Sequence, residues 1–310
     1  MLHLKFIILK RYEMKTAQLI HNATAGNGDH CKEDLIALIK KQGYTVKYYS
    51  TDEANWKDFI KHKTDIICVA GGDGTVRKVA DIVLQSKGKA VPIYLFPMGT
   101  ANNIARTLEI SSEHFGLEKK LKAEAAPFDS AIIHGIPEEN FFIEGLGVGI
   151  FPELMYQMKH NRIEDESPED KLQRTRQVLI DLLADFKAHK VIIEGENIQI
   201  EDQFLMVELM NIKYAGPNLQ LAPRAKAGDG YLDLVLVREE KRSLLIDYVT
   251  QIIKGQEQVQ KLDEFAEFIK VKKIKMSSEL AKLHVDDILI DDYSGYEINI
   301  TINSASLSIF

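Results

Sequence analysis

The chain has 310 residues, which allows two ordinary domains with a sizeable core, and a formal net charge of -7. The negative charge argues against nucleic-acid binding, which needs a basic face, and no apolar run approaches the ~20 residues of a membrane span. The two cysteines, Cys31 and Cys68, indicate a reducing cytosol rather than a disulfide framework, so we expect a cytoplasmic protein.

Residues 1–13, "MLHLKFIILKRYE", have a short apolar centre with basic residues on both sides. They lack the long apolar region and the small-residue cleavage site of a signal peptide. The chain from Met14 onward opens at once as a strand. We therefore expect residues 1–13 to be an N-terminal extension, either from an upstream start or as a loosely ordered arm. An intact mass that begins at Met1 would reject the upstream-start idea.

Short apolar segments alternate with helical patterns in the first part of the chain. The strands are predicted at 16–22, 45–50, 65–70 and 91–96, and the helices near 29–42, 55–62, 75–87 and 101–109. Such alternation is typical of βαβ units and of a parallel sheet that is covered on both faces. We predict a three-layer α/β domain over residues 14–128.

Strand-like runs predominate after about residue 127. They include "NFFIEGLGVGIF", "NIQIEDQFLMVELMN" and "GYLDLVLVRE". Apolar residues at helical spacing predict two helices, at 169–189 and 242–254, and the acidic stretch 160–170 is expected to be a surface loop. This pattern favours a second, mainly antiparallel domain that resembles a β-sandwich or barrel, which we place at residues 129–296.

The segment "CVAGGDGTVRKVAD" at 68–81 places three glycines and an aspartate between a buried strand and a helix. Glycines allow positive φ and a close approach to a ligand, and the N–H groups of such a loop and of the helix N-terminus bind phosphate. The segment matches neither the P-loop nor the G-x-G-x-x-G pattern. The alternative is a tight strand-to-helix turn in which Asp73 is a cap.

Two further polar loops follow strands of the same domain. They are "HNATAG" at 21–26 and "PMGTANNIAR" at 97–106, where Thr100 and Asn102 can cap the next helix and donate to phosphate oxygens. The carboxyl ends of parallel strands meet at one edge of a sheet, where α/β proteins bind ligands. Three loops that converge there predict a nucleotide site, although each loop alone could be a simple turn.

Three motifs in order, "GGDGT", "PMGTANN" and "GPNLQLAPRAKAGDGYLDLV", resemble the diacylglycerol kinase catalytic-domain family. That family includes bacterial lipid kinases and is related to sphingosine and ceramide kinases. The first motif alone is shared with NAD kinases, but the combination is more specific to lipid kinases. The resemblance covers nearly the whole chain from Met14. It implies an active site between the two domains and a last segment, 297–310, that returns to the first domain.

The resemblance implies transfer of the ATP γ-phosphoryl group to a hydroxyl of diacylglycerol or a similar lipid. Such transfer depends on positioning and on neutralising phosphate charge, with Mg²⁺ as the main Lewis acid. The implied nucleotide contacts are Asn22 and the loop to Gly26, then Gly71, Gly72, Asp73, Gly74 and Thr75, and finally Gly99, Thr100 and Asn102.

The resemblance also implies metal positions. Asp73 would lie near Mg²⁺ through water, as part of the catalytic machinery, and Asp129 matches an acidic position of the family's metal network. Asp229 and Asp233 match a stretch that binds a structural metal in some members. The alternative is that the "GDG" at 228–230 is an ordinary hairpin turn.

The chain departs from the family pattern at several positions. Ala23 follows Asn22 where a proline is usual, and Arg77 and Lys78 follow the glycine motif where an Asn and a Glu are usual. Asn103 stands where the family has an Asp, which removes one carboxylate from the metal network. Ile288 stands where the family has the Glu that acts as general base. Of these changes, Asn103 and Ile288 motivate the alternative of a protein that binds its ligands without turnover.

Asp286 is our predicted replacement for the missing base, with Asp287 and His284 as neighbours on the same strand. Strand alternation would put His284 and Asp286 on one face and Asp287 on the other. The alternative is that both aspartates are solvated turn residues. Arg77 and Lys78 could bind an anion, such as the ATP phosphates or a lipid head group, or they could line the outer face of a helix.

We expect the protein to meet a lipid substrate peripherally at a membrane surface, and a homodimer is left open. The stretch "KVKKIK" at 270–275 could face anionic lipid or could be a solvated strand face. Besides a lipid kinase, two functions are left open. One is a small-molecule kinase similar to NAD kinase, and the other is a nucleotide- or lipid-binding protein that has lost turnover, which Asn103 and Ile288 motivate.

Overall fold

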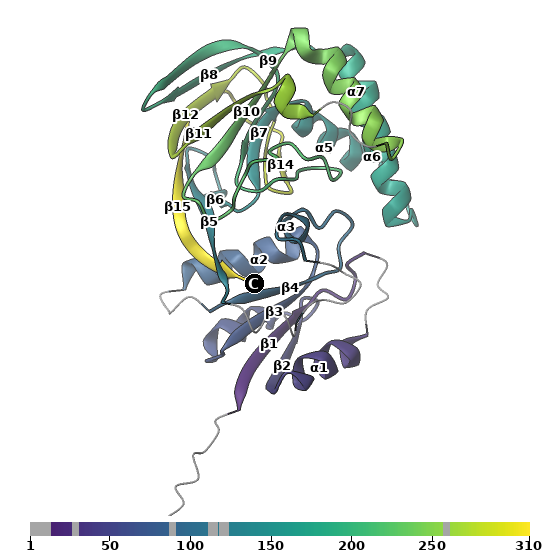
Figure 1. The fold of residues 1–310 in the computed structure, drawn as a ribbon, viewed down its shortest axis with the longest axis vertical. Coiled ribbons are helices and arrows are strands. Elements are labelled where there is room, and N and C mark those ends of the chain that lie inside the picture. Colours follow the sequence, from purple (N-terminus) through teal and green to yellow (C-terminus); the bar gives the residue numbers. More distant parts are fainter. Residues whose placement is uncertain (1–13, 27–30, 87–90, 111–116, 118–123, 257–260) are drawn as a thin grey trace, which may run out of the picture.

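The computed structural model describes residues 14–26, 31–86, 91–110, 117, 124–256 and 261–310. The expected extension at 1–13 lies outside the described residues. Figure 1 shows an α/β domain below and a larger, strand-rich domain above it. The last strand, β15 (Ile298–Ile309), runs from the upper domain down to the lower one.

Parallel strands form the sheet of the first domain, in the order β4-β3-β1-β2. They are β1 (Lys15–His21), β2 (Tyr44–Ser50), β3 (Ile66–Gly71) and β4 (Ile93–Pro97). The helices between them are α1 (Lys32–Lys41), the 3-10 helix η1 (Trp56–Lys61), α2 (Asp73–Gln85) and α3 (Asn103–Thr107). The predicted α/β alternation is confirmed, with 3-10 geometry near 55–62.

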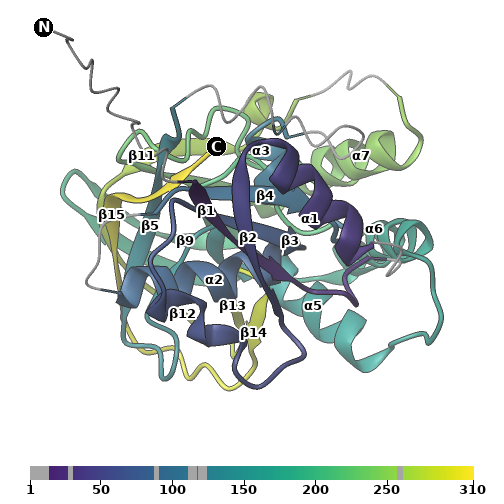
Figure 2. The ribbon, with the colours of Figure 1, turned by 90° about the horizontal axis from the view of Figure 1, so that it is seen from below.

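Strand β3 is buried at every residue because helices cover both faces of the sheet. Ile67 and Val69 share one apolar cluster with Val79 of α2. Cys68, which points to the opposite face, shares another cluster with Leu35 of α1. Figure 2, seen from below, shows α1 on the near side of the strands. The sheet and the helices on its two faces form three layers. Because β1, β3 and β4 are parallel, their carboxyl ends lie at one edge of the sheet.

Antiparallel strands build the second domain. They are β5 (Ala126–His134), β6 (Phe141–Phe142), β7 (Gly145–Gly149), β8 (His189–Gly195), β9 (Ile198–Met210), β10 (Leu232–Arg238), β11 (Glu267–Val271), β12 (Lys273–Ser278), β13 (Leu283–Val285) and β14 (Ile288–Ile290). Their apolar side chains, among them Leu146, Val207 and Ile274, form one buried cluster. The predicted β-rich second domain is confirmed.

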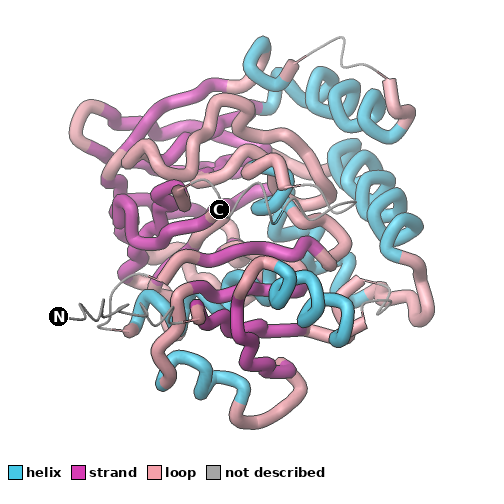
Figure 3. Tube along the Cα trace, turned by 60° about the horizontal axis from the view of Figure 1, so that its bottom comes forward, coloured by secondary structure: helices cyan, strands magenta, loops and turns pink. Residues whose placement is uncertain are grey.

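Helices α5 (Ile150–His160), α6 (Pro168–Asp185) and α7 (Arg242–Ile253) gather on one side of the strands of the second domain (Figure 3). The sequence predicts α6 and α7 but extends a strand through residue 151. The structure instead begins α5 at Ile150, with Pro152 in its first turn, where a missing N–H costs nothing. Among the described residues, no helix is long and apolar enough to cross a membrane.

Strand β15 belongs to both domains. Its first half pairs antiparallel with β12, and it pairs antiparallel with β5 along most of its length. It joins β4 only at its end, where Ile309 is the parallel partner of Ile93. The return to the first domain is therefore confined to the last residues of the strand, and the proposed boundaries at 128/129 and 296/297 stay predictions.

Candidate active site

The three polar loops meet at the edge of the parallel sheet, as the sequence predicts. Asn22 donates from Nδ2 to Thr75 Oγ1 at 3.2 Å. The N–H of Met98 donates to the Gly71 carbonyl oxygen at 3.0 Å. A Cβ on Gly72 would lie 3.0 Å from Gly99 Cα, so the second and third loops are in contact backbone to backbone.

Asn102 shapes its own loop. Its Oδ1 accepts the Gly99 N–H at 2.8 Å, and its Nδ2 donates to the Gly99 carbonyl oxygen at 2.7 Å. Its φ of 52° lies in the left-handed region, which Asn tolerates better than most residues. With its amide used in this way, Asn102 contributes to the site by fixing the loop, and a direct nucleotide contact stays a prediction.

Asp73 is a helix cap, but for α3 rather than for its own helix. Its carboxylate accepts the N–H groups of Asn103 at 2.9 Å and of Ile104 at 3.0 Å. Burial raises the pKa of Asp73, and the nearby negative charge of Asp287 adds to this increase. The second and third loops are thus tied by a carboxylate that also borders a cavity.

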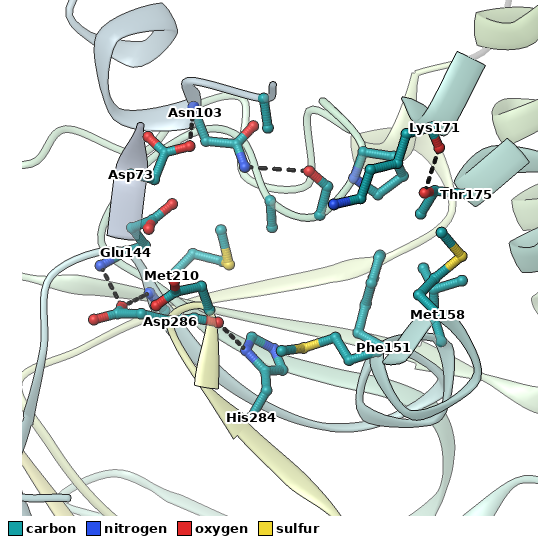
Figure 4. Close-up of a pocket in the computed structure, with 18 residues that line it drawn as sticks. Asp73, Asn103, Glu144, Phe151, Met158, Lys171, Thr175, Met210, His284 and Asp286 are labelled. Carbon is teal, nitrogen blue, oxygen red and sulfur yellow. Dashed lines mark hydrogen bonds between the residues drawn. The ribbon is translucent and has the colours of Figure 1, made fainter. Parts of the chain in front are cut away.

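That cavity, of about 320 Å³, has an acidic end and an apolar end (Figure 4). The acidic end is lined by Asp73, Glu144, Asp286 and Asp287. The apolar end is lined mainly by α5 and the loop after β9, with Phe151, Leu154, Met155, Met158, Ala215 and Pro217. Met210 of β9 lies beside Glu144 and Asp286 (Figure 4). Charged and apolar ligand groups could therefore occupy one site side by side.

The Asp286 carboxylate is surrounded by donors. It accepts the N–H groups of Ile143, Glu144 and Gly145 at 3.1, 2.7 and 3.1 Å, and Arg77 Nε lies 2.9 Å from Oδ2. Burial raises the pKa of Asp286 to about 6, against the opposing effects of Arg77 and the backbone N–H groups. The carboxylate is thus fully engaged by these four donors. This argues against the predicted role of Asp286 as the base.

Asp286 and Asp287 form the turn between β13 and β14, as the pairing of Val285 with Ile288 shows. The φ of Asp286 is 51°. Asp286 and Asp287 are therefore turn residues, and the prediction that strand alternation puts their side chains on opposite faces is wrong. The exposed Asp287 side chain borders the same cavity as Asp286, instead of the opposite face.

Glu144 is the residue at the acidic end that the sequence prediction missed. It precedes β7, and its side chain is buried. Burial raises its pKa well above the ordinary value, and the charges of Asp73, Asp286 and Asp287 raise it further. The signal in the sequence is the single acid within the apolar run "FFIEGLGVGIF", since an unpaired charge is costly in a buried strand.

A buried pair, Glu208 and His284, lies beneath the turn. Glu208 Oε2 is 2.9 Å from His284 Nε2, and the Asp286 carbonyl oxygen is 3.0 Å from His284 Nδ1. Burial alone would lower the pKa of His284, but the charge and hydrogen bond of Glu208 raise it overall. Both ring nitrogens face acceptors, which suits the protonated imidazolium. The sequence prediction also missed Glu208, although it is the single acid in the apolar run "FLMVELMN".

A second cavity, of about 980 Å³, lies beside the first. Thr24, Gly26 and Thr100 line it from the first domain, and Lys159, Arg162 and Lys171 line it from the second. Four residues border both cavities, namely Met155, Met158, Lys171 and Asp287. The two cavities are therefore adjacent. Asp73 and Asn103 bring two of the polar loops to the smaller cavity, and Thr24, Gly26 and Thr100 line the larger one.

Comparisons with known proteins agree with this architecture. Residues 16–131 match the diacylglycerol kinase catalytic domain, and residues 161–286 match the YegS C-terminal NAD kinase beta sandwich-like domain. The chain is a distant member of the diacylglycerol kinase and YegS lipid kinase family. The resemblance predicted from the glycine motifs is confirmed.

The relatives are distant but similar over most of their length. A diacylglycerol kinase of Bacillus subtilis (strain 168) is 26% identical to this chain, and the alignment covers 88% of this chain and 89% of the relative. A probable lipid kinase YegS-like of Pectobacterium atrosepticum is 28% identical, over 71% of this chain and 73% of its own. The crystal structure of a putative diacylglycerol kinase from Bacillus anthracis str. Sterne has a TM-score of 0.72 at 21% identity, with 98% of both chains covered. It shares the fold.

The family's metal positions are occupied differently in this chain. Asp129 is buried, and its two carboxylate oxygens accept the N–H groups of Gly230 at 2.8 Å and of Ala305 at 2.6 Å. Lys270 Nζ lies 2.7 Å from Asp229 and 2.9 Å from Asp233. The ammonium group thus holds the place between two carboxylates where the resemblance implies a structural metal. Neither Asp129 nor Asp229 borders the two cavities.

The lysine-rich stretch at 270–275 is divided between β11 and β12. Lys270 is paired as described above, and Lys275 lies 3.1 Å from Glu297. These pairings reduce the free positive charge of the stretch and argue against its predicted role at a membrane.

The cavity residues suit a Mg²⁺ ion that arrives with a nucleotide. Among the described residues, no group of three or more His, Cys, Asp or Glu side chains could by itself hold a metal. Mg²⁺ usually keeps several waters and binds one or two carboxylates together with substrate phosphates. Asp287 offers such a carboxylate, and Asn103 Oδ1 is buried without a hydrogen-bond partner at the same cavity.

Proposed function

We propose that the protein is an ATP-dependent lipid kinase that phosphorylates a hydroxyl of diacylglycerol or a similar lipid. The continuity of the two cavities carries this proposal. The larger cavity is bordered by the first and third polar loops, through Thr24, Gly26 and Thr100, whose polar groups suit a triphosphate. The smaller cavity presents carboxylates beside an apolar wall, which suits a hydroxyl on an acyl chain. The shared boundary between them is where the γ-phosphoryl group would meet the acceptor.

The nucleotide is held mainly by the first domain in this proposal. The N–H groups of Asp73 and Gly74 at the start of α2 would bind the phosphates. Lys171 faces them from α6 in the second domain. Bound with ATP, Mg²⁺ would neutralise charge on the transferred group, and Asp287 and Asn103 Oδ1 are the groups that would hold it.

Glu144 is the proposed acceptor of the hydroxyl proton. Asp286 is already bonded to four donors, and Ile288 borders neither cavity. The Glu144 carboxylate accepts no hydrogen bond from the described residues. Burial raises its pKa well above the ordinary value, and a carboxylate with a raised pKa is a stronger base.

The acceptor is proposed to be reached at a membrane surface. Ile163 is 53% exposed in the loop between α5 and α6, and it borders the larger cavity beside Arg162. An apolar and a cationic side chain at the rim of a site can contact the interface of an anionic bilayer. The apolar wall of the smaller cavity supports a lipid acceptor over the dinucleotide of an NAD kinase-like reaction.

The proposal is tested with radiolabelled ATP and Mg²⁺ on the full chain. The acceptors are mixed micelles that contain diacylglycerol, monoacylglycerol, phosphatidylglycerol or a sphingoid base, with NAD as a separate arm. We expect labelled lipid with the natural sequence and a kcat about 10²- to 10⁴-fold lower for Glu144→Gln. The exposed Glu240→Gln is the matched control and should be unchanged. Labelled NAD without labelled lipid would contradict the proposal.

A further inference from the structure

We propose that Arg77 is a positioning residue that fastens helix α2 to the segment carrying Glu144, and that phosphoryl transfer depends on this link. The inference rests on the proposed function for its effect on transfer. The link itself is a matter of geometry and can be measured without any activity.

Arg77 is a buried arginine that pairs with two carboxylates of the second domain. Its Nε lies 2.9 Å from Asp286 Oδ2, and its Nη2 lies 2.5 Å from Glu139 Oε2. The guanidinium carbon is 4.8 Å from the centre of the Phe141 ring. A planar guanidinium can satisfy two carboxylates and an aromatic face at once, which a lysine ammonium cannot do.

Arg77 borders neither cavity. Arg77 therefore fits neither role that the sequence left open for it, since it is buried rather than on the outer face of α2 and is paired with Asp286 and Glu139 away from the cavities. The neighbouring Lys78 is exposed on the outer face of α2. The departure from the family pattern at Arg77 therefore produces a contact between domains.

Asp286 connects Arg77 to the backbone that carries Glu144. The carboxylate that receives Arg77 also accepts three consecutive backbone N–H groups, at 143–145. The shortest of these bonds, 2.7 Å, is to the N–H of Glu144 itself. The Asp286 N–H donates in return to the Gly145 carbonyl oxygen at 2.8 Å. Arg77, Asp286 and Glu144 thus form one continuous connection from the phosphate loop to the acidic end.

Loss of Arg77 would leave the buried Asp286 carboxylate without its charge partner. A buried carboxylate with no counter-charge is unstable and tends to move or to take up a proton. Either response weakens its hold on the 143–145 backbone. Because Glu144 is mounted on that backbone, its carboxylate would lose its fixed position, and a displacement of about 1 Å can cost about 10²-fold in rate.

The first test is hydrogen exchange of the amides at 143–145 in the full chain. We expect Arg77→Met to accelerate their exchange by about tenfold or more, as the loss of bonds to a charged group implies. Arg77→Lys should lie in between, because it restores one charge. Unchanged exchange at 143–145 in Arg77→Met would overturn the link.

Arg238→Met is the matched control. Arg238 also contacts two acids and a ring, with its Nε 2.8 Å from Asp202, Glu267 as second partner, and the Phe204 ring 5.1 Å away. It borders neither cavity, and its loss should leave exchange at 143–145 unchanged. If Arg77→Met fails to fold, Arg77→Lys, which keeps a positive charge beside the intact Asp286 carboxylate, is measured in its place, and unchanged exchange at 143–145 in it overturns the link.

The second test separates positioning from general destabilisation. For Arg77→Met we expect kcat to fall about tenfold or more, while the KM for ATP and ATP binding by calorimetry stay close to those of the natural sequence. Arg77→Lys should recover part of kcat. An unchanged kcat in Arg77→Met would refute the dependence of transfer on the link. If the natural sequence transfers nothing, the proposed function fails, and the exchange result still decides the link.

Discussion

The carboxylate of Asp287 lies directly against Gly74. A Cβ on Gly74 would overlap Asp287 Oδ2, although the two residues come from different domains. Gly74 is in the first turn of α2, and Asp287 is in the turn between β13 and β14. The contact brings a carboxylate of the second domain, which borders both cavities, to the glycine loop at 71–75 of the first domain.

Gly74→Ala is therefore expected to impair transfer more than stability. The overlap can be relieved by rotation of the Asp287 side chain, so the unfolding free energy should change little. The displaced carboxylate should lower kcat/KM by about ten- to a hundredfold. In an Asp287→Ala background, Gly74→Ala should have almost no further effect, because the clash is gone. Additive losses in kcat/KM would show that Gly74 acts independently of Asp287.

Lys171 borders both cavities, and Figure 4 shows its side chain pointing toward the middle of the site. We expect Lys171→Met to raise the KM for ATP or lower kcat, for a loss in kcat/KM of about tenfold or more, as for a hydrogen bond to a charged group. The comparison is Lys187→Met, an exposed lysine just beyond the end of α6. Steady-state kinetics that respond equally to both substitutions would remove Lys171 from the site.

Thr175 borders the apolar end of the smaller cavity from α6. Thr175→Trp should fill part of this end and raise the KM for long-chain acceptors, while short-chain acceptors keep their kcat/KM. The exposed Gln177→Trp, on the same helix, is the control. The measurement is kcat/KM against acyl-chain length. An equal effect on short and long chains would mean that the acyl chain binds elsewhere.

The pair of Glu208 and His284 predicts a pH dependence of stability. Because the pKa of His284 is raised in the folded protein, the folded state binds more protons than the unfolded state above pH ~6.5. Its contribution to the unfolding free energy is complete below that pH and is lost as pH rises through the folded pKa. Asp286, whose pKa is raised to about 6, changes the unfolding free energy mainly below pH ~6.5.

Denaturant unfolding at a series of pH values above 6.5 checks this expectation. The unfolding free energy of the natural sequence should fall with pH more steeply than that of Glu208→Gln, in which the partner charge is absent. Equal slopes would show that His284 is not held protonated by Glu208.

The glycine loops and the order of the two domains could be predicted from the sequence because their signals are local. Gly71, Gly72 and Gly74 follow a buried strand directly, and strand ends in a parallel sheet share one edge. The start of α5 was missed for an equally local reason. The apolar run before Ile150 continues into the helix without a polar break, so periodicity alone cannot find the boundary.

The acidic end of the cavity could not be predicted in detail because its contacts join distant segments. Asp286 has the right chemistry for a base, but its donors come from Arg77 and from residues 143–145, which only the fold brings together. Lys270 similarly lies between Asp229 and Asp233, where the resemblance implies a metal, because β10 pairs with β11. A lone acid in an apolar strand, such as Glu144, was the signal available in the sequence.

The most direct measurement is identification of the product formed by the full chain with ATP, Mg²⁺ and mixed lipid micelles, by mass spectrometry of the extracted lipids. The account predicts a lipid that has gained one phosphate on a hydroxyl, together with an equal amount of ADP. ATP binding by calorimetry, with no phosphorylated lipid in any micelle, would contradict it and would identify a pocket that binds without turnover.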